Sequence, residues 1–408
     1  MPLRLLALAL LLSAAARAQP DPPVLDRPVL DLLVPALSPA AEVSLLTMLP
    51  GDEVYSLFGH TAYRITDPAL GLDRTYNYGT FDFDQPFFIA RFARGLLDYQ
   101  LSVASFEQTL AQYRYLGRPI IEQRLALPPD AKQDLFRFLE TNYLPANRAY
   151  RYDFFFDNCS TRPRDALERA LGERLDYGGY RPAGASFRDL IQPYLEAAPL
   201  TDFGIDLGLG APTDRDATRR EAMFLPLELL RAFDAATFDG RPLVAATDTL
   251  FWVPGAGMPD EAFDWPTLVG WLLFAFGAGL TVAARMGKTS ERALRRYDVA
   301  LFGVVGLVGV VIAWLWLGTE HSVTGPNANL LWAWPTHLVA AVALARRNHG
   351  GGMRVYWGLT AITTVATVLL WAVLPQALHA AVLPQALLLA LRAGARAVIP
   401  RPAPSLSS

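Results

Sequence analysis

The sequence has almost no cysteine and little histidine, and this scarcity limits its chemistry. Of the 408 residues, one is cysteine and five are histidine. A single cysteine forms no disulfide within the chain. Before the apolar C-terminal region, Cys159 and His60 are the only cysteine and histidine, too few for a zinc site. The sequence therefore predicts no internal disulfide, no metal and no cofactor.

The chain also lacks an excess of positive charge. It has 36 Lys and Arg against 39 Asp and Glu, a net charge of −3, so nucleic acid is not an expected partner. Hydrophobic residues, by contrast, make up 52% of the chain. They are concentrated at the N-terminal tip and from Trp265 onward. This distribution predicts a soluble body between two membrane-related segments.

The N-terminal tip has the pattern of a secretory signal. Arg4 precedes the apolar run LLALALLLSAAA, and Ala16–Ala18 matches an A-x-A cleavage site. The run is shorter than the roughly 20 residues that a spanning helix needs. We expect a signal peptide at residues 1–18 and a proline-rich lead-in at 19–40. Export would place the lone thiol in an oxidising compartment, where it is a liability unless buried or functional.

The C-terminal region, residues 264–400, reads as a helical membrane domain. Lys and Arg follow the first, third and fifth of its apolar segments, and neither residue follows the second or fourth. By the positive-inside rule, the soluble body then lies outside the cytoplasm. We expect a multi-pass protein of the inner (cytoplasmic) membrane, with its catalytic part in the periplasm. The five predicted spans are 266–284, 298–318, 330–345, 356–374 and 378–399.

The soluble body, residues 41–255, mixes strand and helix patterns and so predicts an α+β domain. Alternating apolar residues and turn signals mark the strands, and 3.6-residue periodicity marks the helices. The glycine-rich run 204–212 is expected to be a loop, without the spacing of a nucleotide site. The predicted strands are 43–48, 60–66, 75–83 and 120–127. The predicted helices are 129–143, a segment after Cys159, 186–195 and 224–235.

Cys159 lies in the run YDFFFDNCSTRPRDAL, among polar residues, at the start of a predicted helix. Ser160 or Thr161 is expected to cap this helix. A lone cysteine is often a small buried hydrophobe, but backbone N–H groups at a helix N-terminus favour a thiolate and can form an oxyanion hole. A helix N-terminus together with an imidazolium can make the Cys159 thiol mostly thiolate.

His60, in SLFGHTAYRI, is the base available to that thiol. A histidine at the start of a strand and a cysteine at the start of a helix are typical of papain-like enzymes, with the histidine earlier here. A third residue should orient the imidazole. In a hairpin of 60–66 with 75–83, the position opposite His60 falls near 77–80, which makes Asn77 the candidate. Tyr78, Asp82 and Asp157 are alternatives.

The runs SLFGHTAYRITDP, YNYGTFDF and NRAYRYDFFFDNCSTRPRDAL resemble the N-terminal periplasmic domain of the lipoprotein N-acyltransferase Lnb family, over residues 41–235. The layout also resembles a permuted papain-like (NlpC-type) thiol domain followed by membrane helices. The resemblance implies that Cys159 accepts the acyl chain and that His60 is its base. Arg162 could contact a phosphate or pair with Asp157. Further residues that match the family motif are Asn158, Ser160, Arg164 and Asp165.

The resemblance implies an acyltransferase that moves a fatty acyl chain, through a cysteine thioester, to the N-terminal amine of bacterial lipoproteins. The donor would be a phospholipid or a diacylglyceryl group. One alternative is an NlpC-type amidase or peptidase acting on cell-wall peptides, which would release fragments from peptidoglycan. Another is a non-catalytic membrane-anchored binding module, which would stay active after Cys159→Ser.

Overall fold

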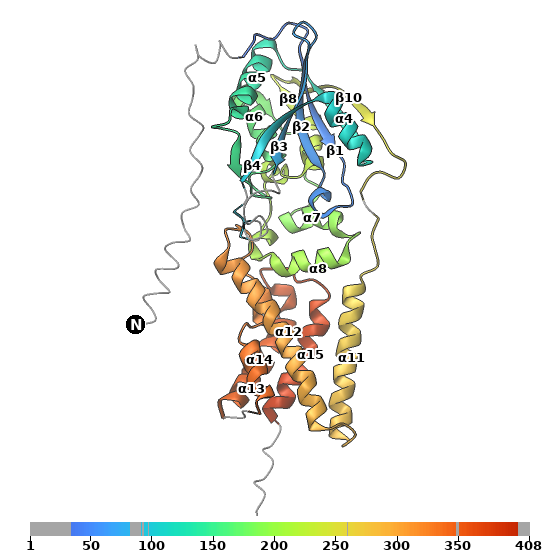
Figure 1. Cartoon of the computed structure of the whole chain (residues 1–408), viewed down its shortest axis with the longest axis vertical. Helices are drawn as coiled ribbons and strands as arrows, with labels where there is room; N and C mark the ends of the chain where they lie inside the picture. The colour runs from blue at the N-terminus through green and yellow to red at the C-terminus, as the bar shows by residue number, and fades with distance from the viewer. Residues whose placement is uncertain are drawn as a thin grey trace, which may run out of the picture.

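The computed structural model describes residues 34–81, 91, 94–96, 98–258, 260–347 and 351–398. An N-terminal part built on a β-sheet is followed by a C-terminal part built of helices (Figure 1). The predicted α+β class is therefore confirmed. The expected signal peptide and most of the lead-in lie outside the described residues.

The larger sheet is antiparallel and has seven strands in the order β10-β5-β1-β2-β3-β4-β6. The predicted hairpin of the second and third strands is present, although β3 begins and ends earlier than the expected 75–83. The strands are β1 (Glu42–Met48), β2 (His60–Asp67), β3 (Leu72–Thr80), β4 (Asp98–Ser105), β5 (Ile120–Leu125), β6 (Ala149–Arg151) and β10 (Val244–Phe251). A second, small sheet has β7 (Leu175–Asp176), β8 (Thr237–Phe238) and β9 (Arg241–Pro242).

Helices cover both faces of the larger sheet, because alternate strand residues point to opposite faces. Val43 and Leu45 belong to the main core under α5, α6, α7 and α10. Leu46 and Met48 face a smaller core that α4 closes with Tyr113. The helices of this part are α4 (Phe106–Tyr115), α5 (Pro129–Tyr143), α6 (Thr161–Leu171), α7 (Phe187–Leu195), α8 (Pro199–Gly208), α9 (Arg219–Ala222) and α10 (Pro226–Ala235). The 3-10 turns are η1 (Val54–Ser56), η2 (Gly172–Arg174) and η3 (Ala211–Asp214).

The prediction of a loop at 204–212 was wrong, because most of this run belongs to α8. Its glycines disfavour a helix, yet tertiary contacts hold the segment. Asp206 is buried in an ion pair with Arg188 of α7. The helix lies between the sheet and the helical bundle (Figure 1). The sequence of residues 204–212 alone does not indicate that this segment packs between the sheet and the bundle.

Five helices form the C-terminal bundle, and two of the described helices have the length and hydropathy of membrane spans, α11 and α12. The expectation of five spans is thus supported only in part. The predicted span at 330–345 is helical only from His337, after Pro335. The bundle helices are α11 (Trp265–Arg285), α12 (Glu291–Gly318), α13 (His337–Ala345), α14 (Gly351–Leu369) and α15 (Val382–Val398), with the turns η4 (Ala328–Leu331) and η5 (Trp371–Val373).

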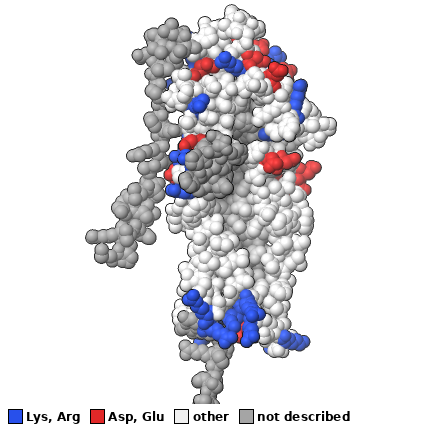
Figure 2. Space-filling model, in the orientation of Figure 1, with Lys and Arg blue, Asp and Glu red and all other residues white. Residues whose placement is uncertain are grey.

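Charge is unevenly distributed over the bundle. Figure 2 shows Lys and Arg gathered at the end of the bundle far from the sheet, with an uncharged band above them. This is the arrangement expected when the far end faces the cytoplasm. Basic residues at the helix ends on this side include Arg285, Lys288, Arg292, Arg295, Arg346 and Arg347.

Polar contacts join the two parts of the chain at α8. The Asn327 side-chain amide donates to the carbonyls of Leu207, Gly208 and Leu209 at 2.9, 3.2 and 3.3 Å. The Gln376 amide also donates to the Leu209 carbonyl, at 2.8 Å. Two side chains from the bundle therefore satisfy carbonyls at the C-terminal end of α8, which otherwise lack partners within the helix.

Candidate active site

His60 is the first residue of β2, and Gly59 makes its position possible. Gly59 has φ of +81°, and a Cβ there would lie 2.8 Å from the Met48 carbonyl oxygen. Only glycine fits such a close approach in this conformation without strain. Met48 is also the residue that pairs with His60 across β1 and β2. The chain thus enters β2 through a tight turn that fixes the histidine at the end of the sheet.

Asn77 is hydrogen-bonded to the His60 side chain. The β2–β3 register pairs Tyr63 with Tyr76, so its continuation puts Gly79 opposite His60 and Asn77 diagonally across, on the same face. Tyr78 is buried in the main core, on the other face. Asn77, the residue that the predicted hairpin placed near His60, is therefore the one that contacts the imidazole. Its catalytic role stays a prediction.

Cys159 follows a short closed loop and stands two residues before α6. The backbones of Asp153 and Asp157 bond to each other and close this loop. The Asn158 carboxamide then accepts from the N–H groups of Ser160 and Thr161 at 2.7 and 2.9 Å. Its NH₂ group donates to two carbonyls, of Phe154 and Phe224. Asn158, rather than the expected Ser160 or Thr161, satisfies the start of the helix.

The thiol and the imidazole meet beside Gly79, which sequence reasoning did not single out. A Cβ on Gly79 would lie 3.5 Å from the Cys159 Cβ, 4.0 Å from the His60 Cε1 and 3.9 Å from the Tyr150 hydroxyl. Gly79 has φ of +92°, and its missing side chain keeps the space between these groups open. A glycine inside a strand often marks a close approach of other groups to the backbone. The position of Gly79 inside the predicted strand 75–83 was therefore the sequence feature that could have pointed to this site.

Tyr150 is the second residue that sequence reasoning missed. Its side chain is 1% exposed, and its hydroxyl has no hydrogen-bond partner among the described residues. A buried phenol normally finds a partner. The Arg162 guanidinium lies 3.5 Å from the centre of its ring. Tyr150 therefore presents an unused donor beside Cys159.

Arg162 and Asp157 form an ion pair in the structure. The Arg162 Nε and Nη2 donate to the two Asp157 oxygens at 2.5 and 2.7 Å. Both carboxylate oxygens of Asp157 accept hydrogen bonds from Arg162, so Asp157 is poorly placed to orient His60. Of the two readings of Arg162, ion pairing is the one the geometry supports. Asp82, another candidate for orienting His60, lies outside the described residues.

A helix N-terminus with an imidazolium can make a thiol mostly thiolate, but the surroundings of Cys159 and His60 favour the neutral form of both side chains. Burial raises the pKa of the Cys159 thiol, an effect that hydrogen bonds from the Thr61 N–H, the Ser160 hydroxyl and its own N–H only partly offset. Burial, with the charge of Arg118, lowers the pKa of His60 to about 4, against which the bond to Asn77 acts weakly. Both groups are therefore neutral at pH 7, and both lie within 4.0 Å of the Cβ position at Gly79.

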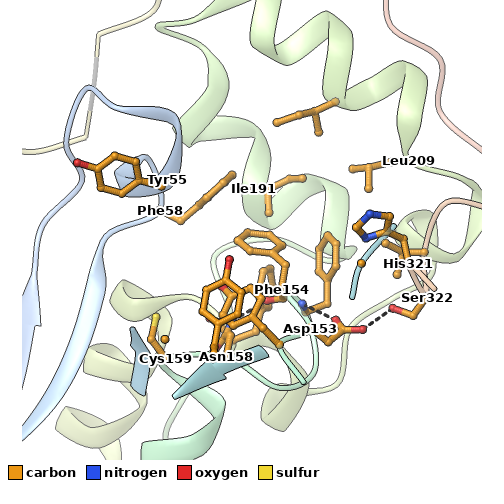
Figure 3. Close-up of a pocket in the computed structure, with 18 of the residues that line it drawn as sticks. Tyr55, Phe58, Asp153, Phe154, Asn158, Cys159, Ile191, Leu209, His321 and Ser322 are labelled. Carbon is orange, nitrogen blue, oxygen red and sulfur yellow. Dashed lines mark hydrogen bonds between the residues drawn. The ribbon is translucent and has the colours of Figure 1, made fainter. Parts of the chain in front are cut away.

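An apolar cavity of about 650 Å³ opens onto Cys159 and His60. Near the thiol it is lined by aromatic rings that include Phe58, Phe154 and Phe224. Its far wall belongs to α8 and to the membrane part, through Ile205, Leu209, Leu315 and the segment 320–324. Figure 3 shows Cys159 and His321 at opposite sides of this cavity, and the Ser322 hydroxyl bonded to the Asp153 carboxylate.

The cavity has the size and lining of a small-molecule site. In the part of the chain that the structure describes, no group of three or more His, Cys, Asp or Glu side chains could hold a metal ion. The side chains at or beside this cavity include a thiol, a neutral imidazole and a phenol hydroxyl, from Cys159, His60 and Tyr150.

Comparisons with known proteins agree with this architecture. The family model for the Lnb N-terminal periplasmic domain matches residues 37–192, and that for the Lnb transmembrane domain matches residues 259–401. No curated protein and no solved structure matches the chain. The two family matches occur in the expected order and divide the chain between its sheet and its helical bundle. The chain therefore belongs to the Lnb lipoprotein N-acyltransferase family, whose domains make it a membrane-anchored, lipoprotein-processing enzyme with a periplasmic domain.

Proposed function

We propose that this protein transfers a fatty acyl chain through a thioester on Cys159 to the N-terminal amine of a bacterial lipoprotein. One observation carries the proposal: an apolar cavity connects the thiol, through Leu315, with the sheet-side end of α12, a helix that has the length and hydropathy of a membrane span. A fatty chain bound there would have its ester carbonyl near the sulfur. A cell-wall peptide, being polar, fits this lining poorly.

In the first half-reaction, the Cys159 sulfur attacks the ester carbonyl carbon of the donor, and His60 takes the thiol proton. Negative charge then develops on the carbonyl oxygen. The Tyr150 hydroxyl, which has no hydrogen-bond partner among the described residues, is a donor available to this oxyanion. When the tetrahedral intermediate collapses, the carbon–oxygen bond breaks. His60 returns its proton to the departing alkoxide, which leaves as an alcohol.

In the second half-reaction, the neutral N-terminal amine of the lipoprotein attacks the thioester carbonyl. The carbon–sulfur bond breaks, the amine proton passes through His60 to the sulfur, and an amide remains on the lipoprotein. Water must stay out while the thioester exists, because hydrolysis competes. Aromatic side chains around the thiol, such as Phe58 and Phe154, serve this purpose.

Intact mass spectrometry of the full chain in lipid nanodiscs tests the proposal. We expect wild type to gain the mass of a fatty acyl group that hydroxylamine removes, and Cys159→Ala to gain none. Adding a lipoprotein with a free N-terminal amine should discharge the acyl group onto that amine. Isotope-labelled phospholipid separates the two donors, because label enters the thioester only if a phospholipid supplies the chain.

The proposal would be overturned if wild type gained no acyl increment from lipid or from a diacylglyceryl lipoprotein with a blocked amine, and if no acyl group reached the free amine of an added lipoprotein. Release of peptides from purified peptidoglycan by wild type but not by Cys159→Ala would establish the amidase instead. Full complementation in cells by Cys159→Ser would establish a binding role without thiol chemistry.

A further inference from the structure

Arg118 is a buried cation without an acidic partner among the described residues. The residue belongs to the segment that joins α4 to β5 and is 7% exposed. Its Nε and Nη2 both donate to one neutral acceptor, the Leu49 carbonyl, at 3.0 and 2.9 Å. The other buried arginines of the described chain all pair with carboxylates. They are Arg164, Arg188, Arg392 and Arg396.

The fold places this charge next to the active site. Leu49 follows Met48, whose strand partners are His60 on one side and Ile120 on the other. The guanidinium is therefore fixed one residue beyond the pair that carries the catalytic histidine. A Cβ on Gly51 would lie 3.0 Å from the Arg118 Cδ, so glycine leaves room for the side chain. An unpaired buried charge costs several kcal/mol, which a purely structural role explains poorly.

Among the described residues, the titratable groups that interact with Cys159 supply no negative charge to offset Arg118, whose guanidinium lies 5.1 Å from the centre of the Tyr113 ring. Tyr99, Tyr113, Tyr150 and Tyr152 interact electrostatically with Cys159, and burial raises the pKa of each, so they are neutral at pH 7. Arg162 is neutralised by Asp157. Arg118 lowers the pKa of both Cys159 and His60, as a nearby positive charge does.

We propose that Arg118 is the fixed positive charge of this active site, a positioning residue that acts through space on Cys159 and His60. The inference rests on the proposed function for its use in catalysis. Negative charge on the sulfur or on the oxyanion is stabilised by the guanidinium. A protonated His60 is made a stronger acid by the same charge, so it protonates the departing alkoxide more readily.

The test uses the full chain, in which Cys159 is the only thiol and any alkylation therefore reports on it. The rate of iodoacetamide reaction is measured against pH for wild type, Arg118→Gln and Arg118→Lys. We expect Arg118→Gln to move the profile to higher pH by about half a unit or more, which is about threefold in rate below the midpoint. Arg118→Lys keeps the charge and should stay close to wild type.

Arg124→Gln is the matched control, because this arginine of β5 is 42% exposed at its side chain and pairs with Asp248. Its loss should leave the profile unchanged, since water screens exposed charges. A folded Arg118→Gln protein with the wild-type profile would overturn the proposal.

If Arg118→Gln does not fold, Gly51→Ala is the second variant, because it displaces the guanidinium without removing it. Gly51→Ala should shift the alkylation profile in the same direction as Arg118→Gln. An unchanged profile in Gly51→Ala would again overturn the proposal. Alkylation needs no acyl donor, so this result is independent of the proposed transfer reaction.

Discussion

At Cys159 and His60, the protein interior stabilises the uncharged form of both side chains. This separates the site from thiol enzymes that hold a thiolate–imidazolium pair at rest. In the proposed mechanism the proton moves only as the sulfur attacks, and a neutral resting thiol reacts more slowly with oxidants and stray electrophiles than a thiolate does. For an exported protein with one cysteine, a protonated resting state protects the nucleophile.

The lowered pKa of His60 predicts a pH dependence of stability. The unfolded chain protonates this histidine below about 6.5, whereas the folded chain keeps it neutral until about pH 4. The unfolded state therefore binds more protons, and the free energy of unfolding should fall as pH drops from about 6.5 towards 4. Chemical denaturation of wild type and His60→Gln across this range checks it. If the free energy of unfolding had the same pH dependence in both proteins, His60 would not be the group responsible.

Asn77 gives a second prediction at the residue scale. Asn77→Ala removes the bond that orients the His60 ring, so it should lose part of the roughly 10²–10⁴-fold that a positioned base contributes. The rate of acyl loading in single-turnover experiments measures this loss. Asn77→Asp is the informative companion, because a carboxylate at that position should raise the pKa of His60 and move the acidic limb of the rate profile upward. An unchanged rate in the alanine variant would assign the orientation of His60 to another residue.

Among the elements, those fixed by local signals were predictable from sequence. Helix α5 has the predicted bounds, because Pro129 starts it and an apolar face continues to Tyr143. Helix α8 was missed, because its glycines disfavour a helix and tertiary contacts hold it, from Arg188 of α7 and from Asn327, which is more than 100 residues away. Likewise Cys159 and His60 stood out by scarcity, whereas Gly79, Tyr150 and Arg118 joined the site only through strand pairing and packing.

The junction between the Asp153–Asp157 loop and α6 yields a prediction at the element scale. Asn158→Ala would leave two N–H groups and two carbonyls without this partner. We expect a loss of about 2 kcal/mol in stability together with altered alkylation of Cys159. Ser105→Ala removes the cap of the distant helix α4 and should cost about 1 kcal/mol with unchanged alkylation. Thermal unfolding and alkylation rates distinguish the two effects, and identical alkylation in both variants would refute a special role for Asn158.

For the whole molecule, the important feature is that two parts of the chain build one cavity. Gly208 of α8 lies at this boundary, and a Cβ there would be 3.6 Å from the Leu315 Cδ1 of α12. Gly208→Leu should therefore fill the far end of the cavity and slow loading of long acyl chains more than short ones. Competition between donors of two chain lengths, read by the mass of the acyl-enzyme, measures the ratio. If the ratio of long to short acyl groups loaded onto the enzyme were unchanged, the fatty acyl chain would not bind at this end of the cavity.

Leu315 reaches the cavity from the outer end of α12, a helix of 28 residues whose apolar stretch has the properties of a membrane span. Helices adjust to bilayers of different thickness by tilting. Because α12 also lines the proposed acyl cavity, we expect the rate of acyl loading to depend on bilayer thickness, and lipid vesicles of different chain length would measure that dependence.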